Sequence, residues 1–198
     1  RKLIEAKDGK SGRLRAEFVW KDGEGKELLA EDKAVVISGN KETRTLDFDI
    51  TLTALTAVTF GDTKEGTFAI RLARSLEEKG QTGTMQNAQG ATKEKNVWGK
   101  RSPWVDYSGQ VEGESLGVAI FDHPSNPRHP IYWHSRAYGL FAANMFGVHD
   151  FENDKSKDGK LEMKAGEKMR VRYRVLIHPG DTQKADIGKH FAQYASKK

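Results

Sequence analysis

The stretch EKMRVRYRVLIH, at residues 167–178, decides the fold prediction because it is the longest alternation of polar and apolar residues in the chain. Its apolar residues are Met169, Val171, Tyr173, Val175 and Ile177. A period of two is typical of a β-strand with one buried and one solvated face. The stretch TRTLDFDITLTAL, at residues 43–55, repeats the pattern with threonines and aspartates on its wet face. Strands of this kind favour an antiparallel sheet.

Shorter alternating stretches extend the prediction to most of the chain. They are RLRAEFVW at 13–20, AVVIS at 34–38, GTFAIRLA at 66–73, WVDYSGQV at 104–111, LGVAIFD at 116–122, IYWHSR at 131–136 and YGLFAA at 138–143. Residues 74–97 are polar and rich in turn formers, which indicates a long loop. Together these features predict an all-β protein.

Only one segment has clear helical periodicity. Asp181 is placed to cap residues 182–195, in which Ile187, Phe191 and Tyr194 recur at a spacing of three to four. Many strands and one C-terminal helix predict a large antiparallel β-sandwich, similar to a supersandwich. No shift in composition divides the chain, so we expect one domain over residues 1–198.

Composition excludes several classes of protein. The 33 basic and 28 acidic residues are interleaved, and a net charge of +5 spread in this way argues against nucleic acid as a partner. The absence of cysteine excludes disulfides, a thiol nucleophile and a thiolate metal site. The apolar runs at 117–121 and 139–143 are far shorter than the ~20 residues of a membrane-spanning helix. The sequence leaves the oligomeric state open.

One basic strand face is an exception to this mixing of charges. Lys168, Arg170, Arg172 and Arg174 alternate with the apolar residues of the 167–178 stretch. Such a face is usually solvated, although it can also bind a polyanion such as an acidic polysaccharide. Glu162 and Glu167 weaken the patch, so the solvated face is the favoured interpretation.

The segment FDHPSNPRHPIYWHSR, at residues 121–136, is the richest functional candidate. Its histidines are His123, His129 and His134, and its prolines predict a rigid loop that presents polar side chains. The spacing of the histidines matches no metal motif, so a copper or iron site is the weaker alternative. Hydrogen bonding to hydroxyl or carboxylate groups is favoured, with Asp122, Arg128 and Arg136 as binding residues.

Two further segments place functional residue types between or on strands. FGDTKEG, at residues 60–66, brings Lys64 and a carboxylate, Glu65, into one short connection, although a tight hairpin is the favoured interpretation. WGKRSPWVDYSG, at residues 98–109, interleaves aromatic and charged residues that suit either a sugar platform or a core.

Four stretches carry a resemblance to a known family. They are LTALTAVTFGDTKEGTFAIRLA at 52–73, WGKRSPWVDYSG at 98–109, GVAIFDHPSNPRHPIYWHSRAYGLFAANMFG at 117–147 and RYRVLIHPGD at 172–181. They resemble the bacterial family labelled methane oxygenase PmoA-like. Members of that family are longer at the N-terminus and carry an HHRG motif that this chain lacks. The resemblance therefore implies that the chain is the C-terminal portion of a longer protein.

The resemblance also implies expectations about location, architecture and function. We expect a periplasmic or extracellular protein with an architecture similar to the galactose mutarotase-like β-sandwiches, which act on carbohydrates. That last step is an analogy between folds. The family label itself implies a different activity, a metal-dependent oxygenase in which His123, His129 and His134, or upstream histidines, hold copper or iron.

From these observations we expect a carbohydrate-active protein, either a sugar-modifying enzyme or a sugar-binding module. A histidine of the set His123, His129 and His134 is the expected proton shuttle and Glu65 its partner carboxylate. The expected substrate-binding residues are Lys64, Arg71, Asp122, Arg128 and Arg136. A metal oxygenase and a non-catalytic interaction domain stay open as alternatives.

The histidine segment also yields a geometric prediction. At least two of its three histidines are expected to line one concave, solvent-reachable surface, with Arg128 or Arg136 nearby. The alternative buries each histidine separately.

Overall fold

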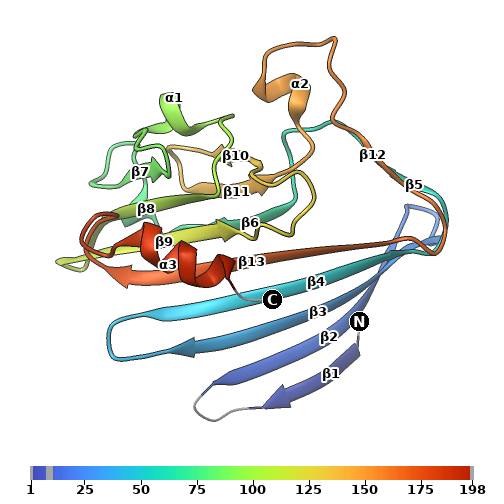
Figure 1. Ribbon diagram of the computed structural model, residues 1–198, viewed down its shortest axis with the longest axis horizontal. Coiled ribbons are helices and arrows are strands. Elements are labelled where there is room, and N and C mark those ends of the chain that lie inside the picture. The colour runs from blue at the N-terminus through green and yellow to red at the C-terminus, as the bar shows by residue number, and fades with distance from the viewer. Residues whose placement is uncertain (1, 8–10, 197–198) are drawn as a thin grey trace.

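A computed structural model describes residues 2–7 and 11–196. Its main feature is an eight-stranded antiparallel sheet in the order β1-β2-β3-β4-β13-β9-β8-β7 (Figure 1). The strands are β1 (Lys2–Lys7), β2 (Gly12–Lys21), β3 (Glu27–Gly39), β4 (Arg44–Ala54), β7 (Thr84–Asn87), β8 (Trp104–Val111), β9 (Glu114–Asp122) and β13 (Lys168–Pro179). The two stretches with the longest alternation, β13 and β4, are neighbours at the centre of this sheet.

The register of β13 explains which face is buried. Tyr173 lies opposite Phe48 of β4 on one side and Asp122 of β9 on the other. Because directly opposed residues of antiparallel strands share a face, the apolar residues of β4 and β13 form one continuous inner surface. This surface faces the second layer of the sandwich.

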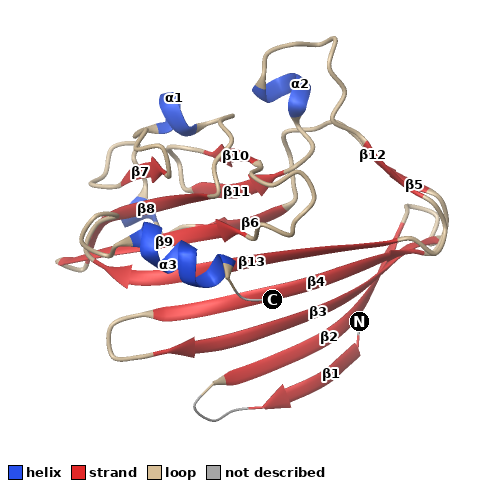
Figure 2. Ribbon diagram, viewed as in Figure 1, coloured by secondary structure: helices blue, strands red, loops and turns tan. Residues whose placement is uncertain are grey.

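The second layer consists of two small antiparallel sheets. One has the order β10-β11-β6 and the other pairs β12 with β5. Their strands are β5 (Val58–Phe60), β6 (Phe68–Arg71), β10 (Tyr132–Ser135), β11 (Leu140–Asn144) and β12 (Leu161–Met163). Trp133 and Phe141 of the three-stranded sheet pack with Tyr107 and Tyr173 of the large sheet in one core. The predicted all-β antiparallel architecture with a C-terminal helix is thus confirmed (Figure 2).

The C-terminal helix covers the opposite face of the large sheet. Helix α3 (Ile187–Ala195) packs Ile187 and Tyr194 against Trp104, Phe121 and other residues of the outer face. The helix begins later than the predicted residue 182, and its cap is Asp186, which accepts a hydrogen bond from the backbone of Lys189. Asp181 instead closes a turn by accepting from the backbone nitrogens of residues 183 and 184.

The polar stretch at 74–97 has more structure than a loop. It contains a 3₁₀ turn, η1 (Arg74–Leu76), strand β7 and a one-turn helix, α1 (Glu94–Val97). A second one-turn helix, α2 (Val148–Phe151), follows β11. Single turns are too short to produce a helical period, so the sequence pattern could not predict them.

In the described residues, the second layer reaches Leu29 of β3 but leaves much of the N-terminal part of the large sheet uncovered. Strands β1, β2 and β3 extend away from the small sheets (Figure 1) and leave Leu3, Leu14 and Ile37 exposed. Within the described ranges, no helix is long and apolar enough to cross a membrane. The ends of the predicted domain, residues 1 and 198, lie outside these ranges.

Candidate functional site

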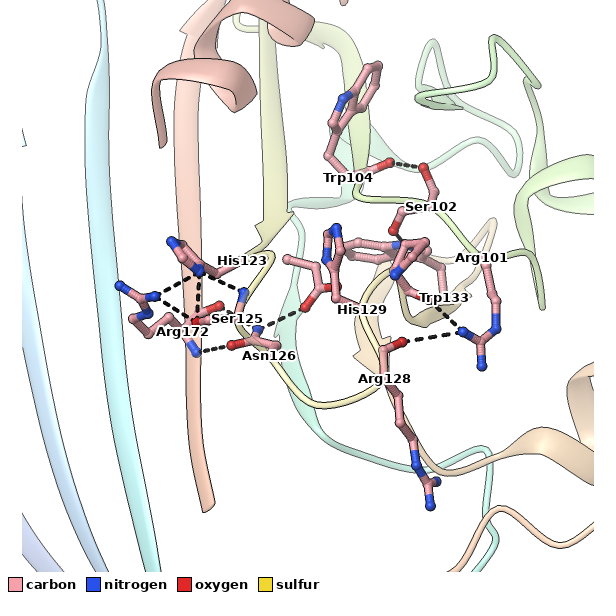
Figure 3. Close-up of polar contacts among 12 residues, drawn as sticks. Arg101, Ser102, Trp104, His123, Ser125, Asn126, Arg128, His129, Trp133 and Arg172 are labelled. Atoms are coloured by element: carbon pink, nitrogen blue, oxygen red, sulfur yellow. Dashed lines mark hydrogen bonds and ion pairs between the residues drawn. The ribbon is translucent and has the colours of Figure 1, made fainter. Parts of the chain in front are cut away.

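The loop between β9 and β10 is fastened to β13 by Asn126 (Figure 3). The Asn126 amide donates to Asp122 Oδ1 at 2.8 Å and to the backbone oxygen of Arg172 at 2.7 Å. Its own oxygen accepts from the backbone nitrogen of Arg172 at 2.7 Å. Because Asn126 is buried, these bonds hold the loop in one place.

Asp122 and His129 form a partly enclosed pair. The carboxylate of Asp122 is fully buried, and its Oδ2 lies 2.6 Å from Nδ1 of His129. The His129 ring stacks at 6.5 Å on Phe191 of α3. A carboxylate fixes the tautomer and orientation of its histidine, which suits either acid–base chemistry or a structural bond.

His123 is engaged by its own loop and by β13. Its Nδ1 accepts from the backbone nitrogen of Ser125 at 3.0 Å and lies 2.9 Å from Nη2 of Arg172 (Figure 3). Its ring meets Tyr194 of α3 edge-on, at 5.1 Å. His123 and His129 therefore both contact α3.

The Arg128 side chain binds backbone oxygens of the protein itself. Its guanidinium donates to the backbone oxygens of Met145, Gly159 and Lys160. It thereby joins the histidine loop to the segment that follows β11. The predicted role of Arg128 in substrate binding would need it to leave these three acceptors.

His134 lies apart from the other two histidines, on the outer face of the three-stranded sheet. Its ring is 6.1 Å from that of Trp98 and 6.2 Å from that of Phe151, between α1 and α2. Burial lowers the pKa of His134, and the charges of Arg136 and Lys64 act in the same direction, whereas Glu65 opposes them. The imidazole is therefore neutral at pH 7.

The three histidines do not converge on a common point. In the described part of the chain, no group of three or more histidine, aspartate or glutamate side chains is placed to hold a metal ion. The residues present therefore do not fit a copper or iron centre. The expectation that two histidines line one concave surface stays a prediction.

Arg71 and Arg136 also lie around the outer face of the three-stranded sheet. The Arg71 guanidinium sits over the ring of Tyr138 at 5.3 Å, and that of Arg136 sits over the same ring at 5.7 Å. Arg136 also pairs with Glu94 at 3.2 Å. The structure thus brings Arg71, Arg136 and His134 to one region and leaves Asp122, His123 and His129 in another.

Two of the four basic side chains on this face of β13 are paired with aspartates of β4. Arg170 pairs with Asp49 and Arg174 with Asp47, each through two hydrogen bonds from β13 to β4. Guanidinium groups that already donate two hydrogen bonds to an aspartate have few donors free to bind a polyanion. Lys168 and Arg170 are exposed, as a solvated face requires, whereas Arg174 is buried beneath α3 and lies 4.7 Å from the ring of Tyr194.

The 61–67 connection is not the tight hairpin that the sequence favours. Strand β5 pairs with β12, and β6 pairs with β11, so the two flanking strands belong to different sheets. Asp62 holds the connection by accepting from the backbone nitrogens of His149 at 3.1 Å and Gly159 at 2.5 Å. Sequence reasoning missed this because strand partners distant in the chain leave no local signal.

The same connection forms one wall of a cavity of about 640 Å³ over the inner face of the large sheet. The opposite wall is built by apolar residues of β4 and β13. Its aromatic lining consists of Trp20, Phe48, Phe60, Phe68, Phe146 and Tyr173. Of the predicted site residues, Glu65 lines this cavity. Burial raises the pKa of Tyr173 far above its ordinary value, so this phenol stays protonated.

Three side chains at the cavity were missed by sequence reasoning. Trp20 is 46% exposed, and its Nε1 donates at 2.6 Å to Glu31, which is only 6% exposed. Lys33 Nζ lies 2.6 Å from the other oxygen of Glu31 and 5.0 Å from the ring of Phe18. The signal was present in the sequence, because Glu31 and Lys33 are charges on the apolar face of a strand.

A further buried cluster supports the C-terminal helix. His178 Nε2 lies 2.9 Å from Asp106 Oδ1, and Thr182 donates to Asp106 Oδ2 at 2.6 Å. Burial lowers the pKa of His178, but the hydrogen bond and charge of Asp106 outweigh it and raise the pKa overall. This cluster ties β8 to the turn before α3 and takes no part in the cavity.

Several solved structures are similar to this fold at low sequence identity. A proposed aldose 1-epimerase of Escherichia coli K12 is 10% identical, with a TM-score of 0.41, over 90% of this chain and 68% of that one. A proposed aldose 1-epimerase of Klebsiella pneumoniae is 11% identical, with a TM-score of 0.44, over 94% of this chain and 56% of that one.

An aldose epimerase homologue of C. elegans is 10% identical, with a TM-score of 0.44, over 91% of this chain and 69% of that one. The chain therefore spans between about half and about two thirds of the length of these proteins. No curated protein matches the chain in sequence. The sequence does match the family of unknown function DUF6807 over residues 1–192, and the chain belongs to that family.

Proposed function

We propose that the chain binds a neutral sugar, or a small molecule derived from one, in the cavity over the inner face of the large sheet. The observation that carries the proposal is the combination of an aromatic wall with the Trp20–Glu31–Lys33 cluster at the same cavity. Ligand pockets are typically apolar cavities with a few polar groups that fix orientation. A sugar needs both features, because its ring carries apolar C–H faces and a rim of hydroxyls.

Trp20 supplies the platform in this proposal. An indole that is 46% exposed on a strand face offers a flat apolar surface for the C–H face of a sugar ring. Its Nε1 is held by Glu31, so the ring has a fixed orientation before a ligand arrives. Pre-organisation of this kind lowers the entropy lost on binding.

Glu31 supplies the polar contact. Its carboxylate is held on one side by Trp20 and on the other by Lys33, and a carboxylate has about four lone-pair sites. The remaining sites accept hydrogen bonds from sugar hydroxyls. Glu31 pairs with Lys33, and Glu65 lies 3.8 Å from Lys64, so the charges at the cavity are balanced. This balance favours a neutral ligand.

A sugar-modifying activity is the more specific form of the proposal. Two carboxylates line the cavity, Glu31 and Glu65. Most glycoside hydrolases use a pair of carboxylates for their acid–base chemistry. Among the predicted catalytic residues only Glu65 takes part, since none of the three histidines lines the cavity. In this form Glu65, on the exposed wall, exchanges protons with a sugar hydroxyl while Trp20 orients the ring.

The test is a titration with neutral monosaccharides, followed by tryptophan fluorescence and thermal shift. We expect saturable binding at millimolar sugar, with Trp20→Ala weakening it about three- to tenfold and Glu31→Gln by a similar factor. The matched control is Val19→Ala, the exposed neighbour on the other face of β2, which leaves binding unchanged. Absence of binding by every neutral sugar, or equal binding by Trp20→Ala, would overturn the proposal.

We also propose that the chain is related to the PmoA-like family and is exported from the cytoplasm. Within the described ranges, the histidines do not assemble a centre that could hold copper or iron. Elemental analysis of the purified protein tests the oxygenase alternative directly. Stoichiometric copper or iron bound by the wild-type chain, and lost in His134→Gln, would favour that alternative over sugar binding.

A further inference from the structure

We infer that the outer face of the three-stranded sheet carries a second ligand site, for an acidic oligosaccharide. Its residues are Arg71, Arg136, Tyr138, Trp98 and His134. This face of the three-stranded sheet lies beside α1 and α2, away from the large sheet (Figure 1). The inference is independent of the proposed function, because none of these five residues lines the cavity.

The first observation is a row of alternating guanidinium groups and aromatic rings. Arg71 lies 5.3 Å from the ring of Tyr138, Arg136 lies 5.7 Å from the same ring, and Arg136 lies 5.9 Å from the ring of Trp98. Tyr138 is 41% exposed. Aromatic rings bind the C–H faces of sugars, and planar guanidinium groups bind carboxylates through two parallel hydrogen bonds. The cluster therefore offers aromatic rings to sugar faces and the Arg71 guanidinium to a carboxylate.

The second observation is a pair of enclosed nitrogens without partners at the end of the row. In the part of the chain that the structure describes, neither Nδ1 of His134 nor Nε1 of Trp98 has a hydrogen-bond partner. His134 is only 4% exposed, and its ring lies 6.1 Å from that of Trp98. A buried polar group without a partner is rare and destabilising. Hydroxyls of a bound sugar satisfy both nitrogens.

The third observation concerns charge. Arg71 donates one bond to the backbone oxygen of Tyr138 at 3.0 Å, and no carboxylate within the described ranges lies within ion-pair distance of it. The charges that face His134 are those of Lys64, Arg136, Glu65 and Glu94. Lys64 and Arg136 each have an acidic neighbour, so Arg71 is the cation left to receive a ligand carboxylate. This favours an acidic ligand over a neutral one.

The experiment compares trigalacturonate with its carboxyl-reduced, neutral counterpart by isothermal titration calorimetry at low salt. We expect the acidic trisaccharide to bind and the neutral one to bind at least about tenfold more weakly. Arg71→Ala weakens binding of the acidic trisaccharide about tenfold. Trp98→Phe, which keeps an aromatic ring but removes Nε1, weakens it several-fold. The matched control is Arg74→Ala, another exposed arginine, which leaves affinity unchanged.

A second readout separates ligand contact from a structural role. The imidazole nitrogens of His134 are followed by ¹⁵N nuclear magnetic resonance during the titration, and we expect a ligand-dependent shift that is lost in Arg71→Ala. Circular dichroism checks that each variant folds. Equal affinity of Arg71→Ala and wild type, equal affinity for the neutral trisaccharide, or no binding would overturn the inference. Tighter binding of polyglutamate than of trigalacturonate would also overturn it, in favour of an acidic peptide.

Discussion

The two halves of the eight-stranded sheet are built from the same alternating pattern but differ in what covers them. In the half formed by β4, β13, β9, β8 and β7, the small sheets cover one face and α3 covers part of the other, so Tyr107, Tyr173 and Phe121 are fully enclosed. In the half formed by β1, β2 and β3, Leu14 is 44% exposed and Ile37 is exposed as well. Alternation therefore predicts a strand without predicting whether its apolar face is buried.

Because of this difference, the groups that stabilise the fold and the surface available to a ligand lie in different parts of the sheet. The covered half holds the large aromatic side chains and the enclosed Asp106–His178 pair, which are the groups that stabilise the fold. The cavity lies at the boundary between the two halves of the sheet. The second layer ends there at the 61–67 connection, and Trp20 of β2 lies in the half that we call bare, formed by β1, β2 and β3. A boundary of this kind leaves an apolar surface accessible to a ligand and keeps it on a rigid sheet.

The largest effect is expected for Trp133→Ala in the covered half. Trp133 is fully buried, its Nε1 donates to the backbone oxygen of Ser102 at 2.8 Å, and its ring lies 5.7 Å from that of Phe141. Removal of a core tryptophan costs about 3–5 kcal/mol of unfolding free energy. Urea denaturation measures it, and Trp133→Phe keeps the test informative if the alanine variant does not fold.

The counterpart in the bare half is Leu14→Ala. Because Leu14 is already exposed, we expect a loss of less than about 0.5 kcal/mol in the same urea experiment. A loss in Leu14→Ala as large as that in Trp133→Phe would show that the bare half is covered in solution and would break the comparison.

An intermediate effect is expected for Gly117→Ala, on the outer face of β9. An added Cβ would lie 2.2 Å from Cε1 of His178 and 3.0 Å from the backbone oxygen of Tyr107. His178 is enclosed and bound to Asp106, so it cannot move aside freely, and overpacking of this kind costs about 1–3 kcal/mol.

The matched control for Gly117→Ala is Gly188→Ala in α3, where the added Cβ meets nothing within 4 Å. Since glycine weakens a helix, this variant is expected to gain up to about 1 kcal/mol. Thermal unfolding followed by circular dichroism compares the two variants. Equal melting temperatures of Gly117→Ala and wild type would mean that His178 is not confined as described.

The smallest effect is a pH dependence of the His178–Asp106 pair. The pKa of His178 is raised above its ordinary value of 6.5 in the folded chain, since the hydrogen bond and charge of Asp106 outweigh burial. The stability that it contributes is therefore fully present below pH 6.5 and is lost as the pH rises through the folded-state pKa. His178→Gln should lose most stability relative to wild type in mild acid and less in base.

His134 supplies the opposite sign in the same measurement. Its pKa is lowered, chiefly by burial, so protonation of the unfolded chain removes stability as the pH falls below 6.5. The free energy of unfolding of wild type should therefore decrease relative to that of His134→Gln as the pH falls. Parallel curves for the two histidine variants would contradict these assignments.

Sequence patterns predicted the strands well, whereas the roles of the candidate site residues stay predictions. The alternation in residues 43–55 and 167–178 predicted β4 and β13, because a period of two is a local property of a half-buried strand. The 61–67 connection was misjudged as a hairpin, since the partners of β5 and β6 come from β12 and β11, far along the chain. Asp186 rather than Asp181 caps α3, because both positions fit a capping pattern and only backbone geometry distinguishes them.

The histidine-rich segment shows the same division between local and tertiary information. Its prolines and polar residues predicted a fixed loop, which Asn126 fastens to β13. The sequence alone determined the strand periodicity, the terminal helix, the absence of thiol chemistry and the set of polar residue types available to a ligand. Tertiary structure decided that His123 and His129 contact α3, while His134 faces Trp98 and Phe151. The physical reason is that periodicity fixes which residues share a face, whereas the pairing of distant strands fixes which faces meet.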